Sequence, residues 1–186
     1  MKTPLYLIAL TCVLPLSAQA IEYKQLVVDK SSIQFGYKQM GVAMNGRFSR
    51  FSADLSMDPA QPTKGRARID IDLASIDTGS PEANEEVVGK LWFNTKTYPS
   101  ASFVASSIKL VSPNRYEVAG KLTIKGRSAD ILAPASFSNQ GNLGVFDGSF
   151  SFKRADFAIG EGPWAAFDAV ANDIQVKFHL VTQAGK

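Results

Sequence analysis

The sequence has very few of the residues that build metal sites and nucleophilic catalytic centres. It contains one cysteine, Cys12, and one histidine, His179, among 186 residues. Zinc sites, haem and iron–sulfur clusters draw their ligands mainly from cysteine, histidine and acidic side chains, and a Ser–His–Asp triad would have to use His179. Phosphate-binding glycine loops and calcium-binding loops are also missing from the sequence. We therefore expect no metal and no cofactor.

One enzymatic alternative stays open, a pair of carboxylates such as Asp156 and Glu161. Acidic pairs arise by chance in a chain with 17 Asp and Glu residues. His179 alternates with Phe178 and Leu180, which places it on the polar face of a predicted strand. A solvent-facing histidine explains that position better than a general base does. We therefore predict that the protein is not an enzyme.

The N-terminus has the layout of a secretory signal peptide. Lys2 precedes an apolar run from Leu5 to Leu16, and Ser17-Ala18-Gln19-Ala20 places small residues where a signal peptidase cuts. The apolar run is too short for a spanning helix, which needs about 20 apolar residues. We expect residues 1–20 to direct export of the chain and residues 21–186 to form a single domain. Cleavage would also remove Cys12, which leaves no disulfide.

The rest of the chain alternates between apolar and polar residues, which is typical of β-strands with one buried face. Residues 66–73 show the pattern without a break, and it recurs at 33–37, 116–124, 148–152 and 173–180. Turn residues separate the predicted strands at intervals of about ten to fifteen residues, which leaves little room for crossover helices. We therefore predict a mostly antiparallel sheet.

One segment predicts a helix instead of a strand. Ser80 offers an N-cap, Pro81 suits the first helical position, acidic residues follow, and Gly89 is placed to end the helix. We expect a short helix near residues 81–90. With an aromatic cluster directly behind it, this helix would either cover a barrel mouth or pack on the core as an ordinary loop helix.

The predicted strand at residues 46–57 contains a break in its alternation. Phe51, Leu55 and Met57 share one face, but Phe48 lies three residues before Phe51. Either a β-bulge turns both phenylalanines inward, or Phe48 is exposed.

About eight strands, each with one apolar face, predict a closed barrel or a sandwich. An eight-stranded barrel either fills its interior with side chains or holds a ligand. Small residues on predicted inward positions would leave volume inside: Ala67, Ala101, Ala105, Ala133 and Ala135. An outer-membrane barrel is the other placement, and it is disfavoured because aromatic girdles are not evident and the insert near residues 80–90 is polar.

Apolar binding is the chemistry that this composition leaves. Burial of each CH2 group contributes about 0.8 kcal/mol, so a chain of several isoprene units can bind without a charged anchor. An anionic headgroup would additionally need a basic residue at the mouth. Arg47, Arg50 and Arg154 are candidates by residue type, although solvation of strand edges is the simpler role for each. The net charge of +3 is not clustered, so we expect no nucleic-acid partner.

Several short motifs, in this order, resemble the YceI-like family of lipid- and polyisoprenoid-binding proteins. They are Asp29 to Phe35, Gly46-Arg47-Phe48, Ile69 to Thr78, Leu91-Trp92-Phe93, Tyr98 to Phe103, Val118 to Gly126 and Phe152 to Gly160. Each motif is weak alone, but together they span the chain after residue 20. One stretch departs from the family: many members carry Arg-Asp and His-Leu where this chain has Asn84 to Leu91.

The resemblance implies an eight-stranded antiparallel, lipocalin-like barrel in the periplasm. It implies a tunnel that takes a long-chain isoprenoid lipid, such as a quinone or a polyprenyl phosphate, as a ligand and not as a cofactor. It also allows a homodimer and transient contact with inner-membrane proteins. We predict that inward apolar residues line the tunnel: Phe35, Phe51, Ile69, Ile71, Trp92, Phe103, Leu122, Phe150, Phe152, Phe157 and Trp164. The alternative is an interaction protein with a filled barrel that docks on a membrane cytochrome or another partner.

Overall fold

The computed structural model describes residues 21–185, so the predicted signal peptide lies outside the described residues. Its strands are β1 (Tyr23–Leu26), β2 (Ser32–Gln39), β3 (Val42–Phe48), β4 (Phe51–Ser56), β5 (Arg66–Asp72), β6 (Ile76–Asp77), β7 (Ser100–Ser112), β8 (Arg115–Ile124), β9 (Arg127–Gln140), β10 (Leu143–Lys153) and β11 (Asp173–Ala184). One α-helix, α1 (Pro81–Val87), and five 3-10 turns complete the described part of the chain.

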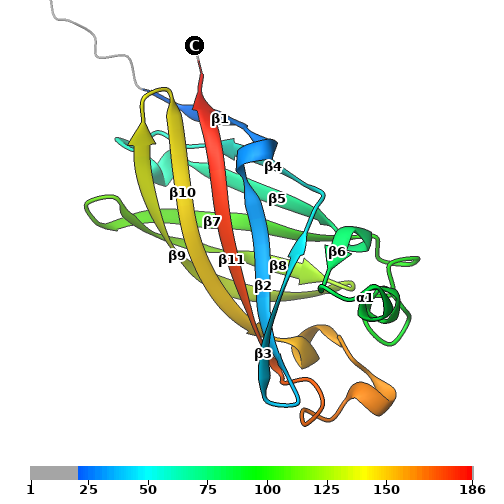
Figure 1. Ribbon diagram of the computed structural model, residues 1–186. Coiled ribbons are helices and arrows are strands. Elements are labelled where there is room, and N and C mark those ends of the chain that lie inside the picture. The colour runs from blue at the N-terminus through cyan, green and yellow to red at the C-terminus, as the bar shows by residue number, and fades with distance from the viewer. Residues whose placement is uncertain (1–20, 186) are drawn as a thin grey trace, which may run out of the picture.

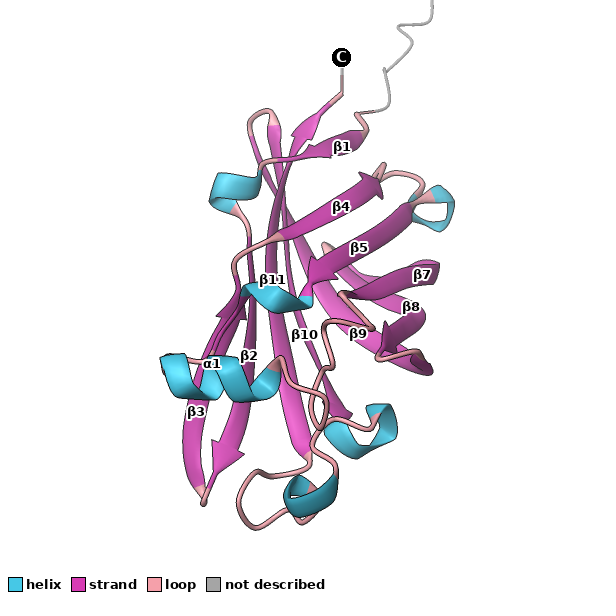
Figure 2. Ribbon diagram, turned by 90° about the vertical axis from the view of Figure 1, so that its right-hand side faces the viewer, coloured by secondary structure: helices cyan, strands magenta, loops and turns pink. Residues whose placement is uncertain are grey.

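The strands form one antiparallel sheet that curls round on itself (Figure 1). Its order is β4-β5-β7-β8-β9-β10-β11-β2-β3-β6, and β1 adds to β11. Figure 2 shows β2, β3 and β11 on one side of the curl and β5, β7 and β8 on the other. The two sides meet through β1, because the Tyr23 N–H donates to the Met57 carbonyl at 2.9 Å and the Met57 N–H donates to the Tyr23 carbonyl at 3.1 Å. The sheet is therefore closed at the β1 end.

The predicted all-β antiparallel class and the short helix are confirmed, but the predicted number of eight strands is wrong. The sheet has eleven strands. The sequence did not predict β1 and β6, because these short strands have too few residues to show a two-residue period. In addition, the predicted strand at residues 46–57 is divided into β3 and β4.

The division at Ser49 and Arg50 also explains the break in alternation between the two phenylalanines. The Ser49 N–H donates to the Ser75 carbonyl, and the Arg50 carbonyl accepts from the Asp72 N–H, so the chain leaves β2 and joins β5 at this point. Phe48 and Phe51 therefore belong to two different strands, and both are half-buried. Phe48 is therefore not exposed. The predicted β-bulge is not present either, because a corner between β3 and β4 separates the two phenylalanines.

Helix α1 begins as its sequence predicts. The Ser80 hydroxyl accepts from the Ala83 N–H at 3.3 Å, and Pro81 occupies the first helical position. The helix ends at Val87, and the Gly89 N–H then donates to the Glu86 carbonyl. Among residues 21–185, the structure contains no helix long and apolar enough to cross a bilayer.

The chain between β10 and β11 is irregular and covers the end of the barrel away from the C-terminus (orange in Figure 1). Arg154 organises this segment, which we call the cap (residues 154–172). Its side chain is only 1% exposed. It donates to the backbone carbonyls of Ile159 (2.8 Å), Gly160 (3.1 Å), Trp164 (2.8 Å), Ala166 (3.0 Å), Val170 (2.9 Å) and Ala171 (3.2 Å). One cation thus satisfies carbonyls that lie outside any strand ladder.

Two aromatic rings flank the Arg154 guanidinium, whose central carbon lies 5.5 Å from the ring centroid of Trp92 and 5.2 Å from that of Phe167. Burial lowers the pKa of Arg154 from its ordinary value, but an arginine remains protonated at neutral pH. The favourable contacts that offset its desolvation are carbonyl dipoles and π-faces.

We predict that Arg154→Leu lowers the free energy of unfolding by roughly 3–5 kcal/mol, because it leaves several buried carbonyls without a donor. Arg154→Lys keeps the charge but has fewer N–H donors, so it should lose a smaller part of that stability. Urea unfolding followed by circular dichroism measures both. The control is Arg68→Leu, which removes an exposed ion pair to Asp70 and should cost far less stability, because solvent screens that pair. Equal losses at positions 154 and 68 would contradict this role.

Candidate functional site

The curled sheet encloses a cavity of about 590 Å³ that runs along the barrel. Its walls come from inward positions of β2, β4, β5, β7, β8, β9, β10 and β11, with α1 and the cap at one end. Apolar side chains provide nearly all of the lining, and alanines contribute at positions 67, 101, 133 and 135. The volume lies within the range of about 300–1,000 Å³ that is typical of small-molecule sites. The interior is therefore not filled by side chains.

Most of the residues predicted to line a tunnel do line this cavity. These are Phe35, Ile69, Ile71, Trp92, Phe103, Leu122, Phe150, Phe152 and Trp164. Two predicted residues are not part of the lining. Phe157 is 1% exposed and packs edge-on against Phe152 in the core, with ring centroids 5.2 Å apart. Phe51 lies at the start of β4, next to the corner where the chain changes strands. Contact of the lining residues with a ligand stays a prediction.

The cavity also includes aromatic residues that were not predicted. Phe48, Phe93 and Tyr37 line it near α1, where the Phe48 and Phe93 ring centroids are 6.4 Å apart. The Phe93 N–H donates to the Val87 carbonyl at the end of α1, which fixes this ring beside the helix. Tyr37 could have been found from the sequence, because it shares the inward face of its strand with Phe35. Phe48 could not, because the corner after β3 hides its direction.

Helix α1 and the cap meet at one end of the cavity, through the hydrogen bond between Trp164 and Glu86. The lining residues that are exposed to solvent here are Gln39 on β2 and Glu82 and Glu86 on α1. The indole Nε1 of Trp164, in the cap, donates to the Glu86 carboxylate at 2.9 Å. We call Gln39, Glu82, Glu86 and Trp164 the rim. Its polar groups surround an interior that is otherwise apolar.

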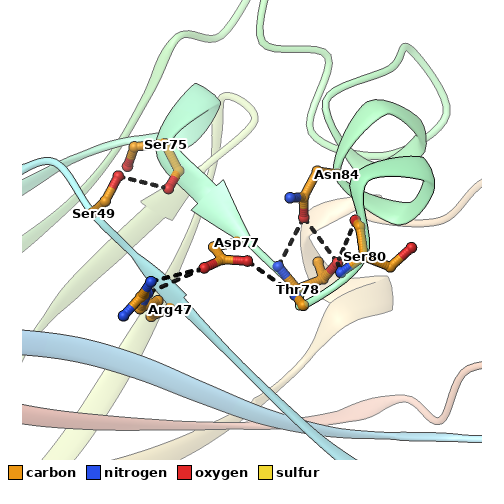
Figure 3. A network of polar contacts seen from close by, with 8 residues as sticks. Arg47, Ser49, Ser75, Asp77, Thr78, Ser80 and Asn84 are labelled. Carbon is orange, nitrogen blue, oxygen red and sulfur yellow. Dashed lines mark hydrogen bonds and ion pairs between the residues drawn. The ribbon is translucent and has the colours of Figure 1, made fainter.

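A polar network attaches α1 to the sheet (Figure 3). The Asn84 side-chain oxygen accepts from both the backbone N–H and the hydroxyl of Thr78, each at 2.8 Å. Asp77, next to Thr78, accepts from the Gly79 N–H at 3.0 Å and from Arg47 at 3.1 Å. The hydrogen bond from Gly79 and the Arg47 charge hold the pKa of Asp77 below its ordinary value. These contacts place the rim carboxylates of α1 at the cavity.

None of the arginines considered for an anionic headgroup has a free N–H group aimed into the cavity. Arg47 pairs with Asp77, and Arg50 pairs with Asp72 at 2.8 Å, both at the outer surface of the sheet. Arg154 lines the cavity, but each of its N–H groups is used by a cap carbonyl. The structure therefore assigns these residues to ion pairs and to the cap.

The histidine and the acidic pair considered for catalysis, Asp156 and Glu161, are not part of the cavity lining. His179 lies on the outer face of β11, with its Nδ1 atom 2.6 Å from the Asp147 carboxylate. Glu161 pairs with Lys125 at 2.7 Å, and this hydrogen bond and charge hold the pKa of Glu161 below its ordinary value. Asp156 lies exposed on the first turn of the cap. Within residues 21–185, no group of three or more His, Cys, Asp or Glu residues could hold a metal ion.

Comparison with solved structures shows the same fold in other bacteria. The crystal structure of BcnA from Burkholderia cenocepacia is 42% identical, with a TM-score of 0.82, over 84% of this chain and 99% of that chain. A polyisoprenoid binding domain from Saccharophagus degradans is 18% identical, with a TM-score of 0.67, over 89% and 99% of the two chains. The second likeness shows the fold alone.

Sequence comparison gives the family. A UPF0312 protein of Pseudomonas putida is 26% identical over 171 residues, which is 86% of this chain and 87% of the relative. Residues 25–182 match the YceI-like domain, a range that includes all of the described strands except the ends of β1 and β11. This match confirms the family that the sequence motifs indicated, and the chain belongs to the YceI-like family.

Proposed function

We propose that this protein is a binding protein, not an enzyme, which holds a long-chain isoprenoid lipid of the quinone or polyprenyl phosphate type. The observation that carries the proposal is the apolar cavity of about 590 Å³ inside the curled sheet. An apolar cavity of this size is costly to leave filled with water, because its walls offer few hydrogen-bond partners. A flexible hydrocarbon chain matches the long shape of the cavity and needs no polar group along it.

The polar chemistry of the site supports binding over catalysis. The carboxylates at the cavity belong to the rim, and one of them accepts a hydrogen bond from Trp164. His179 lies outside the cavity, on the outer face of the sheet. The polyisoprenoid binding domain from Saccharophagus degradans, which has the same fold, adds support for this type of ligand. The same cavity argues against the alternative of a filled barrel that only docks on a partner.

We predict that Phe103→Gln lowers the amount of lipid bound by about tenfold, because it places an amide in the apolar wall where the phenylalanine contributes roughly 1.5–3 kcal/mol. The measurement is mass spectrometry of lipids extracted from the protein after purification from its own host without detergent. Val104→Gln is the matched control, since Val104 is the next residue and is 41% exposed.

Phe103→Leu keeps the wall apolar and should retain the lipid, which separates loss of binding from loss of folding. A wild-type protein that carries no lipid and also refuses added quinones and polyprenyl phosphates would sink the proposal. That result would favour the docking alternative.

The site of action is part of the proposal: the signal-like N-terminus supports export to the periplasm. We expect the periplasmic form to begin at Ile21, with an intact mass that lacks residues 1–20. Leu7→Arg interrupts the apolar run and should hold the full-length chain in the cytoplasm. Thr3→Lys adds a charge before the apolar run and should leave export unchanged. Full-length protein in the periplasmic fraction would contradict cleavage after Ala20.

A further inference from the structure

The charges around the cavity are unevenly distributed. Three of the charged residues that line it are exposed: Glu82 and Glu86 on α1, and Arg66 at the start of β5. Arg66 lies near β1, in the field of Glu22, and Figure 2 shows the start of β5 far from α1. The fourth charged lining residue, Arg154, is buried with its N–H groups taken by carbonyls. The exposed charges of the rim at α1 are therefore both negative, while the buried cation Arg154 meets the rim through its hydrogen bond to the Trp164 carbonyl at 2.8 Å.

Both rim carboxylates are fixed by hydrogen bonds. The Ser80 hydroxyl donates to Glu82 at 2.7 Å, and this bond holds the pKa of Glu82 below its ordinary value. The Trp164 indole donates to Glu86 at 2.9 Å. Residues 82 and 86 are four positions apart on the helix, so their side chains share one face. The nearest basic residue on β2, Lys38, occupies an outward position of its strand and is not part of the lining.

Aromatic rings form the wall directly inside these carboxylates. Tyr37 precedes the rim residue Gln39 by two positions on the same strand face, and Phe93 is hydrogen-bonded through its backbone to the end of α1. The negative face of an aromatic ring attracts a cation and does not attract an anion. Rings that present a face to the cavity at this end would add to the preference of the rim carboxylates for a cation.

We infer that the rim selects the polar end of the ligand, admitting an uncharged or cationic end and repelling a phosphate or carboxylate. The inference rests on the proposed function and decides between its two ligand types, in favour of the quinone type over the polyprenyl phosphate type. The physical basis is the repulsion between two fixed carboxylates and an anionic headgroup at the rim, where water and salt weaken the interaction without removing it.

The test compares three probes with one tail, namely geranylgeraniol, geranylgeranylamine and geranylgeranyl phosphate. Both tryptophans of the chain line the cavity, so their fluorescence reports occupancy directly. At low salt we expect the phosphate to bind about tenfold more weakly than the alcohol, and the amine at least as tightly as the alcohol.

The double variant Glu82→Gln with Glu86→Gln removes the charges and keeps the oxygens that accept from Ser80 and Trp164. It should bring the phosphate to within about twofold of the alcohol and weaken the amine. Glu85→Gln is the matched control, because Glu85 is on the same helix but is not part of the lining. It should change the discrimination by less than about twofold. Added salt should reduce the discrimination of the wild type.

Each contrary result has a distinct meaning. Equal affinity of the wild type for alcohol and phosphate, or discrimination that survives the double variant, overturns the rim inference and leaves the proposed function intact. Phosphate binding that is lost in Arg66→Gln overturns it too, because the headgroup then lies at the β1 end. Failure of the alcohol, the amine and the phosphate alike to bind overturns the proposed function together with the inference.

Discussion

Each strand has to place its apolar face on the concave side of the sheet, and the rest of the structure follows from this constraint. The two-residue period directs Ile69 and Ile71 inward and Arg68 and Asp70 outward on β5. When the sheet curls, the inward faces meet and form an interior without polar partners. Alanine at positions 67 and 133 limits how far opposite walls fill that interior. Small side chains among the large ones therefore leave a cavity inside the sheet.

An open end is the weak point of such a sheet, because irregular chain must cover it and irregular chain has unpaired carbonyls. Arg154 solves this problem with one side chain that supplies N–H groups to residues between 159 and 171. A neutral donor would desolvate more cheaply but could not reach as many carbonyls in different directions. The buried cation therefore determines the conformation of the cap, and with it the position of Trp164 at the rim.

The class of the fold and most of the cavity wall could be predicted from the sequence, because both depend on a local period. Phe35, Phe103 and Phe150 needed only their position in an alternating segment. The corner at Ser49 and Arg50 could not be predicted in the same way, since it depends on contacts with Ser75 and Asp72, which are distant in sequence. Phe157 was predicted inward and is buried, but it belongs to the 3-10 turn after β10 and packs edge-on against Phe152 without lining the cavity.

The inferred role of the rim could not be predicted from the sequence, for a different reason. Acidic residues at the start of a helix are explained fully by the helix itself, so their number on α1 indicates nothing about a ligand. Only the position of the helix shows that Glu82 and Glu86 lie at the cavity while Glu85 does not. That position depends on Asn84 and Thr78, because a helix of seven residues is not stable alone.

The same helix therefore has two tasks that can be separated chemically. Its hydrogen bonds, through Asn84 to the sheet and through Glu86 to Trp164, hold the end of the barrel together. Its charges act on whatever polar group lies at the opening. The apolar walls contribute affinity in proportion to the length of tail that they bury, and they do so for any tail. Discrimination between ligands with similar tails must then come from the few polar atoms at the end, and on α1 those atoms carry a negative charge.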